Sequence, residues 1–219
     1  IDCNIKKVVA LSTDKASKPV SLYGATKLAS DKMFIASNAY SGEHKTQFSV
    51  VRYGNVMGSR GSVIPFFIQE KDKGVLPITD NRMTRFMITL EEGVELVWGA
   101  FEDMCGGEIY VKKIPSMKVT DLAISVDKDA IQQVVGIRPG EKLHEEMIGE
   151  DDSSYTYEYD DYYKILPAIN NWSNSKKLIK EGKKVENGFC YTSDNNGDWM
   201  SIETLQKWIK VNKNKIGRI

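Results

Sequence analysis

The chain has 219 residues, of which 41% are apolar and 27% are charged, a composition typical of a soluble globular protein. Thirty basic residues balance thirty acidic ones, so a nucleic acid or another polyanion is not expected as a partner. No apolar stretch approaches the roughly 20 residues of a membrane helix, and the three cysteines form no CxxC pair. We therefore expect a cytoplasmic protein without a disulfide framework.

The first predicted element is a buried strand that ends on reactive side chains. Val8 to Leu11 is an apolar run long enough for one strand of a parallel sheet, and Thr13, Asp14 and Lys15 follow it closely. In open α/β sheets, ligands bind beyond the carboxyl ends of the strands. These three side chains are therefore candidates for chemistry.

A helix is predicted next, from the N-cap residue Ser21 to about Tyr40. Tyr23 and Lys27 lie four residues apart at its start, and this spacing puts both side chains on one face. Five reactive side chains can therefore converge on one pocket. They are Thr13, Asp14, Lys15, Tyr23 and Lys27.

A second buried parallel strand is predicted at Phe48–Tyr53, and it leads into a loop with three glycines at Gly54–Gly61. Glycines there would let backbone amides approach a ligand, and Arg60 could meet a phosphate. The alternative is a flexible turn that carries a surface arginine.

A longer helix is predicted from Leu90 to Met104. Its apolar residues recur with helical periodicity at Val94, Val97, Trp98 and Phe101. We expect this face to be buried in the core.

The remaining predicted elements are short. They are an apolar helix starting at Pro65–Phe67, an edge strand or turn at Pro77–Asp80, strands at Glu108–Val111 and Val134–Ile137, and a helix at Val119–Ile124. Arg138–Lys142 is predicted to be a turn that opens a further helix, and Glu150–Tyr163 a solvated, partly β segment. An amphipathic helix is predicted from Ile202 to Ile216.

No metal site is predicted. His144 does not begin an HExxH zinc motif, because Ile148 occupies the position of the second histidine. We expect His144 to be a capping or packed residue. The spacing of the acidic residues in Glu150–Tyr163 does not match a calcium-binding loop.

Four segments, in a fixed order, carry a family resemblance. They are STDKASKPVSLYGATK, RYGNVMGSRGSVIPFF, ITDNRMTRF and GIRPGEKLHE. Together they resemble the extended, nucleotide-sugar-modifying branch of the short-chain dehydrogenase/reductase superfamily. Within this branch they are most similar to the C5-inverting UDP-N-acetylglucosamine 4,6-dehydratases. These enzymes are polysaccharide biosynthesis proteins, and they catalyse the first step of pseudaminic acid biosynthesis.

The resemblance implies an α/β fold, the second half of a Rossmann doubly wound parallel sheet with a smaller C-terminal α/β region. We expect residues 1–115 to form the C-terminal half of the NAD(P)-binding domain with the catalytic loops, and residues 116–219 to form a substrate-binding cap. The sequence opens on Ile1–Lys7 rather than on a glycine-rich phosphate turn. We therefore expect an N-terminal truncation on the order of a hundred residues.

The resemblance also implies a reaction. Tyr23, favoured as a phenolate by Lys27, would accept the C4 hydroxyl proton, and Thr13 would orient that hydroxyl. Lys15 would then remove the C5 proton while Asp14 protonates O6. The implied sequence oxidises C4, eliminates water across C5 and C6 and returns hydride to C6, which gives a UDP-4-keto-6-deoxy-hexosamine.

Binding residues follow from the same resemblance. Those implied for the cofactor are Tyr23, Lys27, Tyr53 and Gly54, and those implied for the substrate are Asn55, Arg60, Arg85, Arg138 and Glu141. Arginine suits a diphosphate because its planar fork donates two parallel hydrogen bonds, although each arginine could instead form a surface ion pair. The expected cofactor is NADP, with NAD as the alternative, the expected substrate is UDP-N-acetylglucosamine, and a homo-oligomer is expected.

Two other functions fit the same residues. A UDP-sugar 4-epimerase or reductase of the same superfamily would need Tyr23 and Lys27 but not the Asp14–Lys15 pair. A truncated, non-catalytic fragment would at most bind a nucleotide sugar or an oligomer partner. Loss of water from the sugar is therefore the property that separates the leading hypothesis from both.

Overall fold

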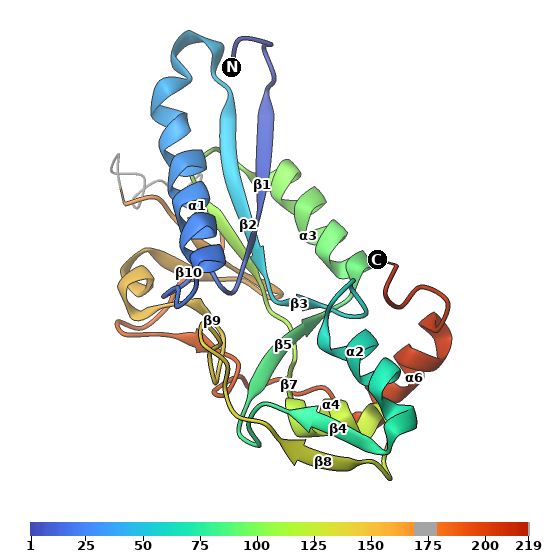
Figure 1. Cartoon of the computed structure of the whole chain (residues 1–219). Helices are drawn as coiled ribbons and strands as arrows, with labels where there is room; N and C mark the ends of the chain where they lie inside the picture. The colour runs from blue at the N-terminus through green and yellow to red at the C-terminus, as the bar shows by residue number, and fades with distance from the viewer. Residues whose placement is uncertain (169–178, 219) are drawn as a thin grey trace. The chain divides into compact units, whose positions relative to one another are not determined.

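The chain passes repeatedly between two units in the computed structural model, which describes residues 1–168 and 179–218 (Figure 1). Unit 1 comprises Ile1–Tyr53, Glu92–Lys113 and Glu146–Tyr191, and unit 2 comprises Gly54–Glu91, Ile114–Glu145 and Thr192–Ile219. Each of the predicted segments 1–115 and 116–219 thus contributes to both units. The division at residue 115 into a cofactor region and a substrate region stays a prediction.

Unit 1 is built on a six-stranded sheet with the order β1-β2-β6-β11-β10-β12. Its strands are β1 (Lys7–Thr13), β2 (Gln47–Tyr53), β6 (Ile109–Lys112), β10 (Thr156–Glu158), β11 (Tyr162–Ile165) and β12 (Lys183–Lys184). β1, β2 and β6 are parallel, whereas the other three strands add in antiparallel fashion. The strands predicted for β1, β2 and β6 are confirmed, and the carboxyl ends of β1 and β2 lie side by side (Figure 1).

Helix α1 (Leu22–Tyr40) packs on β1 and β2, and it begins where the sequence predicts. The side chain of Ser21 caps it by accepting a hydrogen bond from the backbone N–H of Gly24 at 3.2 Å. Two short 3-10 helices, η1 (Gly42–His44) and η3 (Glu150–Tyr155), also belong to unit 1, as does β9 (Glu146–Ile148), which pairs with β13 (Tyr191–Thr192).

Helix α3 (Leu90–Asp103) is confirmed, but its predicted buried face is wrong in part. Trp98 is 63% exposed and Val94 47% exposed. The core of unit 1 instead takes Leu96 and Ala100, which pack with Val51 of β2 and with other core residues. The apolar stripe is therefore rotated from the predicted one, and the predicted residues Val97 and Phe101 are partly buried at its side.

The prediction for the acidic segment Glu150–Tyr163 is correct in part. Its β character is confirmed, because it supplies β10 and part of β11 to the main sheet of unit 1, but the segment is not solvated throughout. Tyr157 and Tyr163 are buried, and the rings of Tyr159 and Tyr162 stack at 4.6 Å. The tyrosines provide the apolar area that makes these strands core elements, while the carboxylates remain at the surface.

Buried tyrosines of unit 1 are expected to make the stability of the fold depend on pH in the alkaline range. Burial raises the pKa of Tyr162 and Tyr163 to about 12, and it also raises the pKa of Tyr110 and Tyr159. Since the folded pKa values exceed the ordinary 10.0, the protonated phenols stabilise the fold below pH 10, and that contribution is lost as the pH rises through about 12. Phenolate absorbance should show a late-titrating group in the native chain and none in denaturant. A single native transition near pH 10 for all ten tyrosines would contradict this.

Unit 2 contains two small sheets covered by helices. Its elements are β3 (Asn55–Val56), β5 (Thr84–Ile88) and β7 (Ser116–Lys118) in one sheet, β4 (Val75–Ile78) and β8 (Ile131–Val134) in the other, α2 (Val63–Glu70), η2 (Lys71–Lys73), α4 (Val119–Val126) and α6 (Ile202–Asn212). Phe67, Leu122 and Leu205 lie in one buried cluster. The three predicted helices are confirmed.

Two predictions in unit 2 are wrong. The strand expected at Val134–Ile137 lies three residues earlier, because Ile131–Val134 pairs in register with Val75–Ile78 of β4. The helix expected to open at Arg138–Lys142 does not form, and the chain continues in irregular structure to β9. The guanidinium of Arg85 binds carbonyls of this segment that a helix would use for its own hydrogen bonds. None of the helices in the described part of the chain has the length and hydropathy of a membrane span.

Candidate functional site

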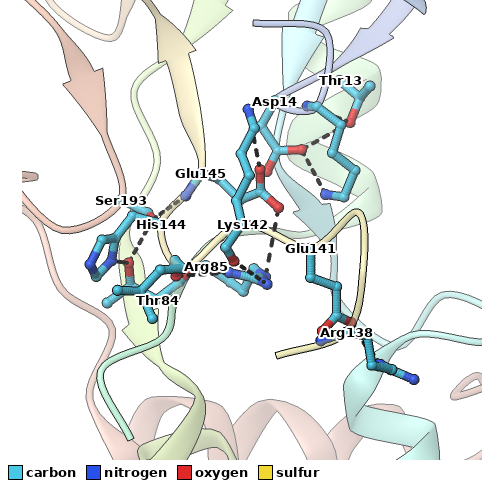
Figure 2. Close-up of polar contacts among 12 residues, drawn as sticks. Thr13, Asp14, Thr84, Arg85, Arg138, Glu141, Lys142, His144, Glu145 and Ser193 are labelled. Atoms are coloured by element: carbon cyan, nitrogen blue, oxygen red, sulfur yellow. Dashed lines mark hydrogen bonds and ion pairs between the residues drawn. The ribbon is translucent and has the colours of Figure 1, made fainter. Parts of the chain in front are cut away.

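Thr13, Asp14 and Lys15 form one hydrogen-bonded cluster at the carboxyl end of β1. Asp14 Oδ1 accepts hydrogen bonds from Thr13 Oγ1 and from Lys15 Nζ, each at 2.9 Å (Figure 2). Asp14 is fully buried, and its Oδ2 atom has no hydrogen-bond partner among the described residues. A hydroxyl, a carboxyl and an amine are thus joined, and the second carboxyl oxygen is buried without a hydrogen-bond partner among the described residues.

Tyr23 and Lys27 lie on α1 next to this strand end. Lys27 Nζ donates a hydrogen bond to the carbonyl of Leu11 at 2.8 Å, which ties the helix to β1. Tyr23 is 54% exposed. Burial, and to a smaller extent the nearby Tyr23, raises the pKa of Tyr53 at the end of β2. Unit 1 therefore gathers six of the predicted residues at neighbouring ends of two parallel strands.

The first turn of α1 touches the loop that carries Lys15. A Cβ atom on Gly24 would lie 2.4 Å from the carbonyl oxygen of Lys15 and 3.0 Å from Cβ of Pro19. Both contacts involve atoms that cannot move away without shifting backbone or a proline ring. Gly24 therefore sets the spacing between the Tyr23–Lys27 face and the Asp14–Lys15 pair.

Replacing Gly24 by alanine is expected to destabilise the fold by about 1–3 kcal/mol, because the added methyl group overpacks this contact. Gly93 in α3 is the matched control, since it is also a buried helical glycine but an added Cβ there would meet nothing within 4 Å. Gly93→Ala should be neutral or stabilising by up to about 1 kcal/mol through helix propensity. Denaturant unfolding measures both, and equal effects of the two substitutions would contradict the contact.

Unit 2 holds a cavity of about 330 Å³ that gathers most of the predicted substrate residues. Its polar lining includes Asn55, Arg85, Arg138 and Glu141, and its apolar walls include Phe66, Phe67, Pro77, Met83 and Val119. Arg60 is exposed and is not among the lining residues. The combination of charged groups and an aromatic wall suits a ligand with an anionic part and a flat ring.

Arg138 and Glu141 form a close pair at this cavity. Arg138 Nη2 lies 2.7 Å from Glu141 Oε1, and Arg138 Nε donates to the same oxygen at 3.0 Å (Figure 2). The Arg138 side chain is 75% exposed. Its guanidinium therefore has donors that an incoming anion can reach.

Arg85 has a different environment from Arg138. It is 9% exposed, and its Nη1 and Nη2 donate to the carbonyls of Leu143 at 3.2 Å and Lys142 at 3.0 Å (Figure 2). Its Nε lies 3.8 Å from Glu145 Oε1. Arg85 therefore holds the segment that carries Arg138 and Glu141 in position, a contact that no sequence motif signals.

A second supporting network includes residues that sequence reasoning missed. Thr84 Oγ1 lies 2.8 Å from His144 Nδ1 and 2.6 Å from Ser193 Oγ, which also accepts a hydrogen bond from the Glu145 N–H at 2.9 Å (Figure 2). Ser193 lies in a turn far along the sequence, so only the tertiary structure reveals this contact. The hydrogen bond with Thr84 makes His144 a packed residue, as predicted. Among the described residues there is no group of three or more His, Cys, Asp or Glu side chains that could hold a metal ion.

Gly54, predicted to bind the cofactor, has a packing reason of its own. A Cβ atom there would lie 2.4 Å from Cβ of Phe86 in β5. Glycine at this position is therefore required by the neighbouring strand whether or not a ligand approaches. Its role toward a cofactor stays a prediction.

Comparison with known proteins places the chain in a family. Residues 1–167 match the family model described as "Polysaccharide biosynthesis protein". The chain belongs to the polysaccharide biosynthesis protein family. Over 208 residues it is 55% identical to the UDP-N-acetylglucosamine 4,6-dehydratase (inverting) of Campylobacter jejuni, covering 92% of this chain and 62% of that protein. It is 39% identical over 197 residues to a UDP-glucose 4-epimerase of Rickettsia canadensis, covering 87% and 58%.

These two relatives are longer, and the chain spans less than two thirds of their length. Among solved structures, the X-ray structure of Pen from Bacillus thuringiensis superposes with a TM-score of 0.83 at 33% identity, covering 97% of this chain and 64% of that one. The predicted resemblance to the inverting dehydratases and the predicted α/β fold class with parallel strands are confirmed.

Proposed function

We propose that the chain carries the catalytic residues of a nucleotide-sugar 4,6-dehydratase that acts on UDP-N-acetylglucosamine and inverts C5. The observation that carries this proposal is the Asp14–Lys15 pair, joined at 2.9 Å, with Asp14 Oδ2 lacking a partner among the described residues. Water loss needs both a base and an acid, and this pair supplies both. The identity to the inverting dehydratase of Campylobacter jejuni, 55%, also exceeds the 39% to the 4-epimerase.

Oxidation at C4 uses the Tyr23 side of the cluster. Tyr23 would accept the hydroxyl proton, Lys27 would favour its phenolate form, and Thr13 would orient the hydroxyl. A bound nicotinamide dinucleotide, NADP or NAD, would supply the hydride acceptor and donor. The chain's residues fit such a group. Tyr23 is half exposed, and the ammonium of Lys27 has three N–H donors, of which the hydrogen bond to the Leu11 carbonyl uses one. Tyr23, Lys27 and Tyr53 would hold it.

Elimination uses the other side of the cluster. Moving one proton from Lys15 Nζ to Asp14 along their 2.9 Å hydrogen bond turns the ion pair into a neutral amine and a carboxylic acid. The amine of Lys15 then takes the C5 proton and Asp14 gives its proton to O6, so that water leaves and the ion pair is restored.

Substrate binding is assigned to unit 2. Arg138 would donate to the diphosphate, Glu141 would accept from nucleotide hydroxyls, and Asn55 would contact the substrate. Arg85 supports their segment through its contacts to Lys142 and Leu143. The cavity that these residues line, together with its aromatic wall, supports the assignment. The role of Arg60 toward a phosphate rests on its place in the Gly54–Gly61 loop and on the resemblance.

Replacing Arg138 by alanine is expected to raise the KM for UDP-N-acetylglucosamine by about 10- to 100-fold with little change in kcat, since one charged hydrogen-bond donor is lost. Arg82→Ala is the matched control, because Arg82 is also an exposed arginine of unit 2, 72% exposed and paired with Asp80 at 2.9 Å. Steady-state kinetics and UDP binding measure the difference. An equal effect of both substitutions would remove Arg138 from the proposed contact.

The function itself is tested by incubating the chain with NADP, or in parallel NAD, and UDP-N-acetylglucosamine in D2O. The expected product is a UDP-4-keto-6-deoxy-hexosamine with deuterium at C5 and inverted configuration, the class of precursor that pseudaminic acid requires. A product that keeps its C6 hydroxyl and differs only at C4 would favour the epimerase. No cofactor uptake and no product would favour a non-catalytic nucleotide-sugar-binding chain.

A further inference from the structure

A buried carboxylate on α1 joins both strands that end in the proposed catalytic cluster. Asp31 is 1% exposed, and its Oδ2 atom accepts hydrogen bonds from Ser12 Oγ at 2.8 Å and from Arg52 Nη2 at 3.2 Å. Ser12 belongs to β1 and Arg52 to β2, and both are buried. One carboxyl group therefore fixes the helix to two neighbouring strands.

The position of this network relates it directly to the proposed catalytic residues. Asp31 follows Lys27 by four residues and Tyr23 by eight, so the three side chains lie along one side of α1. In the sheet, Ser12 is opposite Arg52, and the next pair in register is Thr13 opposite Tyr53. The Asp31 contacts thus lie one residue before the strand ends and one helical turn beyond Lys27.

Arg52 is itself held from a third direction. Its Nη1 donates to the carbonyl of Met147 at 2.6 Å and lies 3.8 Å from Asp152 Oδ2. A buried ion pair whose members are also hydrogen-bonded to other groups resists rearrangement, because breaking it leaves an uncompensated charge. The anchor for Asp31 is therefore rigid.

We propose that Asp31 is a positioning residue, which acts through Ser12 and Arg52 to hold the Tyr23–Lys27 face of α1 in register with Thr13. This inference rests on the proposed function and adds a residue to it. Asp31 touches no reacting atom. Its effect is on the distance between Tyr23 and the strand ends, and displacement of a catalytic group by about 1 Å can lower a rate by about 100-fold.

The test compares Asp31→Asn with Glu108→Gln. Glu108 is also a fully buried carboxylate of unit 1 that accepts a serine hydroxyl, from Ser49 at 2.7 Å, but it precedes β6 at the opposite, amino-terminal end of the parallel strands. Asp31→Asn should lower kcat by about 10- to 100-fold with KM nearly unchanged. Glu108→Gln should lower the melting temperature but leave kcat per folded molecule unchanged. Equal losses of kcat in the two variants would overturn the proposal.

Hydrogen exchange provides a readout that does not need activity. Asp31→Asn should speed amide exchange at residues 11–15 and 22–27, and Glu108→Gln should speed it around residues 105–109 without changing 22–27. An effect of Asp31→Asn confined to residues 28–34 would overturn the proposal. If the unaltered chain has no turnover, the proposed function fails, and the exchange pattern alone then supports or overturns the positioning role.

Ser12→Ala covers the case in which Asp31→Asn does not fold. It keeps both charges of the Asp31–Arg52 pair and removes only the 2.8 Å hydrogen bond from the Ser12 hydroxyl. We expect the same pattern of exchange and a smaller loss of kcat, about 3- to 10-fold, because one hydroxyl donor is lost while both charges stay paired. Unchanged exchange and unchanged kcat in Ser12→Ala would overturn the proposal.

Discussion

Replacing Lys15 by alanine is expected to stop elimination of water while C4 oxidation remains measurable. Lys15 Nζ lies 2.9 Å from Asp14 Oδ1, and the proposed mechanism gives it the C5 proton. Loss of a positioned general base lowers a rate by about 100- to 10,000-fold. Tyr23, Lys27 and Thr13 are unaltered, so the oxidation step keeps its base and its hydrogen bond. Deuterium uptake at C5 and the mass of the product measure elimination, and reduced nicotinamide measures oxidation.

Lys18→Ala is the control for this experiment. Lys18 lies three residues further along the same loop, but its Nζ donates to Glu146 Oε2 at 3.1 Å and not to Asp14. It should leave elimination unchanged. If Lys15→Ala eliminates water at the normal rate, Lys15 is not the base, and the distinction between this chain and a 4-epimerase loses its main support.

Replacing Tyr23 by phenylalanine is expected to abolish both half-reactions, because elimination depends on the 4-keto group that oxidation creates. The ring stays, so packing on α1 is retained and only the phenolic oxygen is lost. We expect oxidation of C4 to fall by about 100- to 10,000-fold with unchanged binding of UDP, since the residues proposed to bind the nucleotide belong to unit 2. Reduced nicotinamide formed in a single turnover measures the step.

Tyr40→Phe is the matched control, because Tyr40 ends the same helix and is 79% exposed. It should have wild-type kinetics. Normal oxidation by Tyr23→Phe would show that another group takes the hydroxyl proton, and Tyr53, the neighbouring phenol at the end of β2, would be the first to examine.

Local patterns predicted the strand and the helix that carry the proposed catalytic residues. The apolar run Val8–Leu11 and the cap Ser21 gave β1 and α1 with nearly correct bounds, because burial between layers and capping are properties of short segments. The contact of Gly24 with the Lys15 carbonyl could not be predicted in the same way. It depends on the path of the loop between strand and helix.

The second half of the site depended more on tertiary structure. Strand β5 (Thr84–Ile88) was not predicted, because its arginine interrupts the apolar pattern, yet Arg85 is buried there through bonds to the carbonyls of Lys142 and Leu143. The same bonds occupy two carbonyls of the segment after Arg138, where a helix is predicted and does not form. Ser193 contacts Thr84 although the two residues are far apart in the sequence, and no local pattern around either residue predicts this contact.

The direct contact between the acid and the amine at the end of β1 has an electrical consequence. Transfer of one proton from Lys15 to Asp14 leaves the sum of their charges at zero. The net charge of the pair is therefore the same before and after the step. Mobile ions respond to net charge over a screening length of about 10 Å at 0.1 M salt. Elimination should therefore proceed at the same rate over a wide range of ionic strength, whereas the proposed binding of the diphosphate by Arg138 should weaken as salt is added.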